Sequence, residues 1–354
     1  GGYVTQGTHP VIWCPHDQSP TGDHDRLRGE GESPTEFILL KFQLGDEIIP
    51  CATLRPETVY GVTNLWVNPT AKYVHVKIEK ENWIISREAV QKFKDQLKNL
   101  EIVHELPAKD LIGKSVVNPV NKQKIPILQG DFVDPATATG IVMSVPAHAP
   151  YDYVALKELN MKITPISVIK VEGFGEYPAA EVSEKMGIKS TKETEKLDDA
   201  TSLVYKKEFH TGILREIAGK YVGKRISEAK DVLVRDFINQ KVADKMWEAS
   251  NPVICRCTNR CHVKILENQW FLKFSDKEWK EKVKQAIAQM KFYPEEARMQ
   301  FINTVDWLED KACARKSGLG TRLPWDKEWI VETLSDSVIY MAYYTISRII
   351  NKEK

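Results

Sequence analysis

An apolar strand that runs into a proline and a charged, hydroxyl-rich turn constrains this chain more than any other feature. Residues 48–52 (IIPCA) have the pattern of a buried strand. Pro56 cannot continue a central strand, so the chain must leave the sheet there. The turn at residues 53–58 (TLRPET) then presents two threonine hydroxyls, a cation and a carboxylate. This composition is typical of the rim of a polar pocket, and the alternative is a turn that caps a helix with Glu57 in its first turn.

A second stretch repeats this design. Residues 138–145 (ATGIVMSV) predict another buried strand, and the prolines at positions 146 and 150 punctuate a loop that contains His148. A helix is expected from Tyr151 to Leu159, with Pro150 near its start and Asp152 in its first turn. Taken alone, Asp152 could simply complement the dipole of that helix.

Together the two stretches resemble the editing domain of class I aminoacyl-tRNA synthetases, in particular leucyl-tRNA synthetases of the archaeal and eukaryotic cytosolic type. Further blocks, among them Trp13-Cys14-Pro15 and the segment from Trp307 to Thr321, resemble the same enzymes in the same order. The resemblance implies an α+β fold. A barrel-like editing domain of mixed strands and helices would be inserted in part of a Rossmann-type catalytic domain.

Three segments are expected along the chain. Residues 1–45 would connect from the catalytic core, residues 46–248 would form the editing domain, and residues 249–354 would hold a cysteine-containing connector and an incomplete part of the core. In the middle segment, strands are predicted at residues 46–54, 73–78, 82–85, 101–105, 125–129, 141–145 and 163–169. Helices are predicted at residues 86–97, with an apolar face of Ala89, Val90, Phe93 and Leu97, and at residues 226–241, with Ile226, Ala229, Leu233 and Phe237 in register.

Composition narrows the class of protein. The 354 residues, 42% of them hydrophobic, suggest two or three globular domains, and the net charge of +1 does not by itself indicate a nucleic-acid binder. No apolar run approaches a membrane span, and six cysteines in a chain of this length fit a reducing compartment. We therefore expect a cytoplasmic protein without a membrane partner, and we also expect it to be monomeric. Because the sequence opens on Gly1 without a methionine, an excised piece of a longer protein is also expected.

The resemblance assigns roles in hydrolysis to three residues. Thr58 would obstruct the leucine side chain and so protect the correct product, and Thr53 would help to hold the ester and the attacking water. Asp152 would pair with the α-ammonium group of the aminoacyl ester, since a charge-assisted hydrogen bond fixes orientation. No strong general base is marked in the sequence, and the family's hydrolysis relies on a ribose hydroxyl and a positioned water.

Five further residues would contact the substrate by the same resemblance. Arg55 would lie near the tRNA 3′ end, with a structural ion pair to Glu57 or another carboxylate as the alternative. Thr139 and Gly140 belong to the stretch that would cradle the terminal adenosine. Met143 follows on the same strand, where valyl enzymes tend to carry a lysine. His148 could contact the substrate or serve a structural purpose.

The substrate implied is tRNA-Leu that carries a noncognate amino acid such as norvaline or isoleucine. No cofactor is expected for editing. ATP and Mg²⁺ would be needed only by a full-length enzyme, since neither a His-x-Gly-His nor a Lys-Met-Ser-Lys-Ser motif occurs in this sequence. Two alternatives stay open: an editing fragment of a valyl- or isoleucyl-type synthetase, and a tRNA-binding module without catalytic activity.

A cysteine cluster raises the question of a metal. Cys255, Cys257 and Cys261 lie within seven residues, and Cys14 could fold against them. Zinc prefers four tetrahedral ligands, often in a C-x2–4-C arrangement, and this spacing only partly conforms. Because bacterial relatives carry a zinc knuckle in the comparable place, a structural zinc at these cysteines is a further hypothesis, and no catalytic metal is expected.

Overall fold

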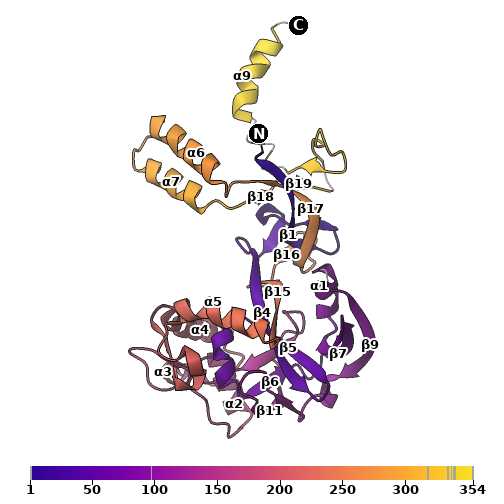
Figure 1. The fold of residues 1–354 in the computed structure, drawn as a ribbon, viewed down its shortest axis with the longest axis vertical. Coiled ribbons are helices and arrows are strands. Elements are labelled where there is room, and N and C mark those ends of the chain that lie inside the picture. Colours follow the sequence, from indigo (N-terminus) through magenta and orange to yellow (C-terminus); the bar gives the residue numbers. More distant parts are fainter. Residues whose placement is uncertain are drawn as a thin grey trace. The chain divides into compact units, whose positions relative to one another are not determined.

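The computed structural model describes residues 2–96, 98–316, 319–332, 335, 337 and 340–352. It divides into two compact units (Figure 1). One unit comprises Gly1–Gly31 and Val253–Lys354, and the other comprises Glu32–Pro252. Strand β4 (Pro34–Leu44), expected in the first segment of the chain, therefore belongs to the larger unit.

A mixed sheet of ten strands is the framework of the larger unit. Its order is β12-β6-β11-β10-β4-β5-β8-β7-β9, and β15 pairs with β4 beside this path. The strands are β5 (Glu47–Thr53), β6 (Asn64–Val67), β7 (Lys72–Ile78), β8 (Glu81–Ser86), β9 (Leu100–Pro107), β10 (Ser115–Val117), β11 (Lys124–Gln129), β12 (Ile141–Ser144) and β15 (Ala243–Ala249). The pairs β5–β8 and β6–β11 are parallel, and the other pairs are antiparallel.

The α+β class expected from the sequence is confirmed, but the described strands do not form a closed barrel. Strands β12 and β9 each pair with a single neighbour and so are the two ends of the sheet path. The sheet is thus open, and its end strand β12 is also the strand that leads into the loop before Asp152.

Helices pack against both faces of this sheet: the apolar residues of α5 pack on one face and those of α1 on the other. The larger unit contains α1 (Ala89–Asp95), α2 (Pro150–Glu158), α3 (Pro178–Lys185), α4 (Thr194–Thr211), α5 (Ile226–Asn239) and the 3-10 turns η2 (Pro56–Gly61), η3 (Ala108–Asp110) and η4 (Glu216–Tyr221). Helices α2 to α5 gather at one side of the unit and α1 at the other (Figure 1). Two short strands, β13 (Ile169–Lys170) and β14 (Ile213–Leu214), pair with each other. The first lies between α2 and α3 in the chain, and the second lies between α4 and α5.

The periodicity of α5 predicted its packing correctly. The residues buried on this helix are Ile226, Ala229, Leu233 and Phe237, as expected from their helical spacing. In α1, Ala89, Val90 and Phe93 are buried as predicted and the Ser86 hydroxyl accepts the Ala89 N–H at 3.1 Å, while Leu97 lies outside the described residues.

One predicted strand is largely absent from the described residues, and two helices were not predicted. The strand predicted at residues 163–169 is irregular up to Val168, and only Ile169–Lys170 forms the short β13. Helices α3 and α4 were not predicted at all. Both are strongly charged, and their apolar residues occupy only a narrow stripe that packs on α2.

The smaller unit is built on a long antiparallel pair, β1 (Val4–Cys14) with β17 (His262–Leu272). Strands β2 (Ser19–Pro20) and β18 (Lys311–Ala312) extend this sheet, and β3 (Arg26–Arg28) pairs with β16 (Ile254–Cys255) and β19 (Ala314–Arg315) with β20 (Ile330–Val331). The helices in the described residues of this unit are η1 (Asp23–Asp25), α6 (Lys277–Gln289), α7 (Ala297–Trp307) and α9 (Tyr340–Ile350).

In the part of the chain that the structure describes, no helix combines the length and the apolar character needed to cross a bilayer.

Candidate functional site

The two threonines of the first stretch are both tied to the backbone of one residue. The Thr53 hydroxyl oxygen accepts the Arg55 N–H at 2.9 Å, and the Thr58 hydroxyl donates to the Arg55 carbonyl at 2.8 Å. The Thr58 N–H bonds to the same carbonyl at 3.0 Å. Pro56 starts the 3-10 turn η2, where its missing N–H costs nothing. The turn therefore holds both hydroxyls in fixed positions around Arg55.

The Arg55 side chain is anchored by acidic groups from two parts of the chain. Its guanidinium bonds to Glu208 on α4 and lies 3.3 Å from Glu57, and it stacks over the Tyr205 ring at 4.3 Å. Burial acts to lower the pKa of Arg55, but the attraction of Glu208 and Glu57 outweighs it, so the pKa is raised. This geometry matches the ion-pair alternative for Arg55, because two carboxylates already balance its charge.

His148 is fully buried, and both of its ring nitrogens are engaged. Nε2 accepts the Val168 N–H at 2.8 Å, and Nδ1 lies 2.6 Å from Oε1 of Glu208. Because a backbone N–H can only donate, the network assigns the proton to Nδ1, which donates to the carboxylate. A ring held in this way has no free nitrogen for a substrate, which favours the structural alternative for His148.

Asp152 lies at the start of α2 and is buried with both oxygens bonded. Oδ1 accepts the Trp66 indole N–H at 2.9 Å, and Oδ2 accepts the Val145 backbone N–H at 2.6 Å. Burial raises the pKa of Asp152 to about 7, although these two hydrogen bonds act in the opposite direction. Each carboxylate oxygen can accept a further hydrogen bond, so an ammonium group could still bind here.

The strand β12 and the turn before it carry the residues expected to cradle an adenosine. Thr139 is fully buried, and its hydroxyl donates to the Ile141 carbonyl at 3.2 Å. Gly140 has a φ of 71° and Met143 is buried, whereas Val142 on the opposite face of the strand is 39% exposed. Thr139 and Gly140 are both buried, so in this arrangement a nucleoside could reach the exposed Thr137 and the Val142 side chain but not Thr139 or Gly140.

The residues predicted to form the site are thus brought together within the larger unit. Strand β12, which leads into the loop before Asp152, packs against β5, the strand that ends at Thr53. Tyr205, which contacts Arg55, also lies close enough to Asp152 for that carboxylate to help raise its pKa, after burial as the main cause.

A cavity in the described residues reaches the first of these strand ends. A cavity of about 190 Å³ lies beside Arg55 on the helical side; its lining is Leu54, Arg55, Glu57, Tyr205, Phe209, Ile226 and Lys230. A larger one, about 540 Å³, lies between α6 and α7 in the smaller unit and contains no predicted site residue. The smaller cavity thus lies next to the hydrogen-bonded network around Arg55, and the larger one lies in the other unit.

Glu208 and Tyr205 on α4 were missed by sequence reasoning. The buried residues of α4 are Leu197, Ala200, Val204 and Glu208, which follow one another at helical spacing. A carboxylate in line with an apolar stripe could have signalled a buried ion pair, because an unpaired charge is too costly to bury.

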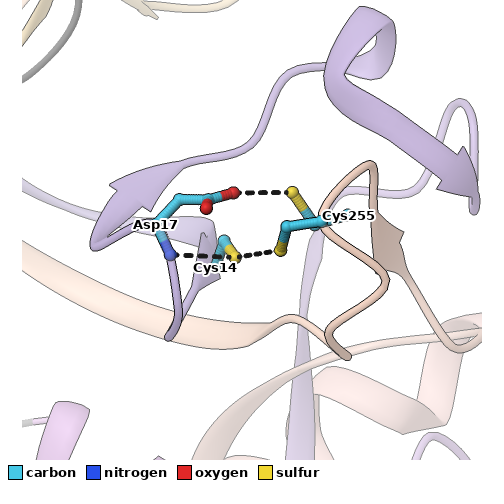
Figure 2. Close-up of side chains that lie close together, drawn as sticks. Cys14, Asp17 and Cys255 are labelled. Carbon is cyan, nitrogen blue, oxygen red and sulfur yellow. Dashed lines mark hydrogen bonds between the residues drawn. The ribbon is translucent and has the colours of Figure 1, made fainter.

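A second group of side chains lies in the smaller unit. One donor atom each from Cys14, Asp17, Cys255 and Cys257 lies within 4.8 Å of the others. Figure 2 shows Cys14 and Asp17 facing Cys255, with 3.0 Å between Cys255 Sγ and Asp17 Oδ2. Cys14 Sγ lies 3.4 Å from Cys257 Sγ. Cys261, which the sequence analysis counted among the ligands, instead contacts the Thr21 hydroxyl at 3.6 Å, and Asp17 takes its place in the cluster.

Solved structures show which class of domain has this fold. The crystal structure titled GlLeuRS-CP1 aligns with a TM-score of 0.52 at 23% identity and covers 60% of this chain and 99% of its own. The cytosolic leucyl-tRNA synthetase editing domain of P. knowlesi aligns with a TM-score of 0.55 at 19% identity, over 61% of this chain and 97% of its own. At these identities the likeness concerns the fold alone, which is that of synthetase editing domains.

Sequence comparison identifies the family. Residues 31–208 match the family model described as "Leucyl-tRNA synthetase, editing domain", so the chain belongs to that family. The leucine–tRNA ligase of Methanothrix thermoacetophila is 50% identical over 364 residues, which is 99% of this chain and 38% of that protein. The ligase of Pyrococcus abyssi is 49% identical over 376 residues, 99% of this chain and 39% of that protein. The chain thus spans about two fifths of the length of these relatives.

Proposed function

We propose that this chain is the editing part of a leucine–tRNA ligase and hydrolyses the ester bond of misacylated tRNA-Leu. The family match supports the reaction class. The observation that carries the proposal is the joining of the two strand ends: the threonines held on Arg55 are connected through Glu208 to the loop that precedes Asp152. The relatives named above are leucine–tRNA ligases, which favours leucine over the valine or isoleucine alternatives.

Hydrolysis of misacylated tRNA is needed because an amino-acid binding pocket can discriminate only weakly between side chains of similar size. A pocket shaped for leucine cannot strongly reject side chains of similar size, since one methylene is worth only about 1–3 kcal/mol. A second site can correct the error if it hydrolyses the wrong ester and excludes the right one. Thr58 suits the excluding role because its bond to the Arg55 carbonyl holds its methyl group in one direction.

Asp152 is the group proposed to bind the substrate's α-ammonium. Its pKa near 7 means that the carboxyl is only partly ionised in the free protein at neutral pH. An arriving cation would favour the ionised form and form a charge-assisted hydrogen bond. Binding and ionisation of Asp152 are therefore coupled, which disfavours esters whose amino group is blocked.

The hydrolytic step needs no side-chain base in this arrangement. Water attacks the ester carbonyl carbon, the bond between that carbon and the ribose oxygen breaks, and the proton of the water ends on the ribose oxygen. His148 is committed to Glu208 and Val168, so it cannot accept that proton without losing a buried hydrogen bond. Thr53, half-buried at the end of β5, would help to position the water and the ester.

The tRNA 3′ end is the proposed partner of the turn at residues 137–142. Its adenosine would contact the exposed Thr137 and Val142, while Thr139 and Gly140 would shape the turn beneath it and Met143 would support the strand from its buried face. The β-carbon of an alanine at position 140 would come within 2.4 Å of Ser86 Cβ, so only glycine allows this close turn.

Deacylation assays test this function. The chain should hydrolyse norvalyl- or isoleucyl-tRNA-Leu and spare leucyl-tRNA-Leu. Asp152→Ala should abolish the reaction, and Thr58→Ala should turn it against leucine. Hydrolysis of all three esters at equal rates by the unaltered chain, or no hydrolysis by the folded chain, would refute the proposal.

We also propose a structural metal site in the smaller unit. Three thiols and a carboxylate fit zinc, whose ligand atoms in a tetrahedron lie about 3.8 Å apart when the Zn–S bond is about 2.3 Å. Cys14 and Asp17 would hold the turn after β1, and Cys255 and Cys257 the turn after β16. Such an ion would fix these two turns to each other and takes no part in the ester hydrolysis.

Metal content after dialysis against Zn²⁺ tests this assignment. We expect about one equivalent in the unaltered chain and in Cys261→Ser, and less than half in Cys255→Ser. Asp17→Asn should weaken zinc retention against a competing chelator. Loss of the metal in Cys261→Ser together with full retention in Asp17→Asn would show that the ligand set is the one first expected from the sequence.

The wider architecture is proposed from the resemblance. Residues outside the editing unit would contribute to a Rossmann-type catalytic domain that binds ATP and Mg²⁺ in the whole ligase, in a monomeric cytoplasmic enzyme. The same resemblance implies a division at residues 45/46 and 248/249, whereas the contacts divide the chain after Gly31 and after Pro252, and pieces excised at either pair of positions distinguish the two divisions.

A further inference from the structure

Glu208 is the most completely buried acidic side chain in the network around the site, with 0% exposure. One of its oxygens bonds to the Arg55 guanidinium and the other lies 2.6 Å from Nδ1 of His148. These partners are 153 and 60 residues away in sequence. A buried charge is tolerated only when it is paired in this way. The side chains of Arg55 and His148 must therefore keep their positions relative to the Glu208 carboxylate.

The first partner controls the two threonines. Arg55 offers its N–H to Thr53 and its carbonyl to Thr58, so the position of its backbone sets the position of both hydroxyls. With the guanidinium held by Glu208 on α4, this turn cannot shift along the end of the sheet without breaking a buried ion pair.

The second partner controls the loop before Asp152. The His148 N–H bonds to the Val145 carbonyl at 2.9 Å, and the Val145 N–H bonds to Asp152 Oδ2 at 2.6 Å. The other ring nitrogen of His148 fixes Val168 at 2.8 Å. The bonds from Glu208 therefore extend to the carboxylate through three short steps.

We propose that Glu208 is a positioning residue for editing: it sets the spacing between the threonine pair and Asp152 while touching neither. This inference rests on the proposed deacylation, and it adds a residue on a helix outside the two sequence stretches. Since a displacement of about 1 Å can cost about 100-fold in rate, the spacing governs both the rate and the exclusion of leucine.

Two substitutions separate spacing from charge. Glu208→Gln keeps the size of the side chain and removes the charge, and Glu208→Asp keeps the charge and withdraws it by one methylene. The matched control is Glu195→Gln, the same change at an exposed position of α4. Each variant is assayed for kcat/KM on isoleucyl-tRNA-Leu and leucyl-tRNA-Leu, and its fold is checked by thermal unfolding.

We expect kcat/KM on isoleucyl-tRNA-Leu to fall roughly 10- to 100-fold in both Glu208 variants, and the preference for that ester over leucyl-tRNA-Leu to narrow, because both depend on geometry. The control should match the unaltered chain. If Glu208→Gln fails to fold, Glu208→Asp decides, since its charge is retained. Full activity and preference in Glu208→Asp would contradict positioning by spacing.

Amide hydrogen exchange tests the positioning role of Glu208 without relying on deacylation activity. The Thr58 amide, bonded to Arg55 at 3.0 Å, should exchange its hydrogen faster in Glu208→Gln than in the unaltered chain, while Glu195→Gln leaves it unchanged. If the unaltered chain hydrolyses no ester, the function proposed above fails, and amide exchange still tests the role of Glu208. Unchanged exchange in both Glu208 variants would overturn the positioning proposal.

Discussion

Asp152 combines burial, two hydrogen bonds and an ionisable group, so its protonation state is part of the local structure. The carboxyl ionises at about 7 in the folded chain, compared with 3.8 as its ordinary value. Between these pH values the folded state keeps a proton that the unfolded state has released. The contribution of Asp152 to the free energy of unfolding is therefore largest below pH 4 and decreases as the pH rises toward 7.

Asp152→Asn should remove this pH dependence. The difference in unfolding free energy between the unaltered chain and the variant should change steadily between about pH 4 and pH 7, by up to about 1.4 kcal/mol per pH unit. It should be flat on either side of that window. Urea unfolding at a series of pH values measures the difference, and a flat difference across the window would show that Asp152 is ionised throughout.

The turn into strand β12 depends on a left-handed backbone conformation at Gly140, which few residues other than glycine adopt. The turn into β12 places Gly140 at φ 71°, where an added β-carbon would lie 2.4 Å from Ser86 Cβ and 2.8 Å from the Pro135 carbonyl oxygen. Gly187 after α3 has a similar φ of 65°, but an added β-carbon there would meet nothing within 4 Å. An alanine at position 187 would therefore meet only the strain of the left-handed backbone, whereas an alanine at position 140 would also meet crowding by its neighbours.

Gly140→Ala should accordingly cost more stability than Gly187→Ala. We expect about 1 kcal/mol at position 187, from the left-handed conformation alone. At position 140 we expect about 3 kcal/mol or more, because Ser86 or the turn must also move. Chemical denaturation of both variants gives the comparison, and equal losses would mean that the turn relaxes freely.

At the scale of the whole molecule, the larger unit begins and ends on the same pair of strands. Strands β4 and β15 are antiparallel, with Pro34 opposite Ala249. The chain therefore enters and leaves this unit at one place, which is the arrangement expected of a domain inserted in another. Strand β4 also carries Leu39, Leu40 and Phe42, all fully buried.

Excision should reveal these boundaries. We expect residues 32–252 to unfold in one cooperative transition when expressed alone, because the two ends stay paired. Residues 46–248 should lack such a transition, since the excision removes β4 and exposes the strands on both sides of it. Far-UV circular dichroism during heating distinguishes the two pieces. A cooperative transition in residues 46–248 would restore the boundary expected from the sequence.

The sequence by itself determined the parts of the site that depend on neighbours in the chain. These parts are the end of β5 shortly before Pro56, the two threonines that bond to Arg55, and the helix that starts at Pro150. Each depends on bonds across a few residues. The apolar period of α5 likewise predicted its buried face. Local spacing is enough for such features because turns and helix starts join residues only two to four positions apart.

Only the tertiary structure decided which distant groups meet. Nothing in the local pattern pairs Arg55 with Glu208, replaces Cys261 by Asp17 in the thiol cluster, or puts β4 beside β15. Each of these contacts depends on how whole helices and strands pack. The partner of a buried charge or thiol is the polar group that this packing places within bonding distance. The spacing between the threonines and Asp152 is likewise a property of the packed helix α4 and the sheet.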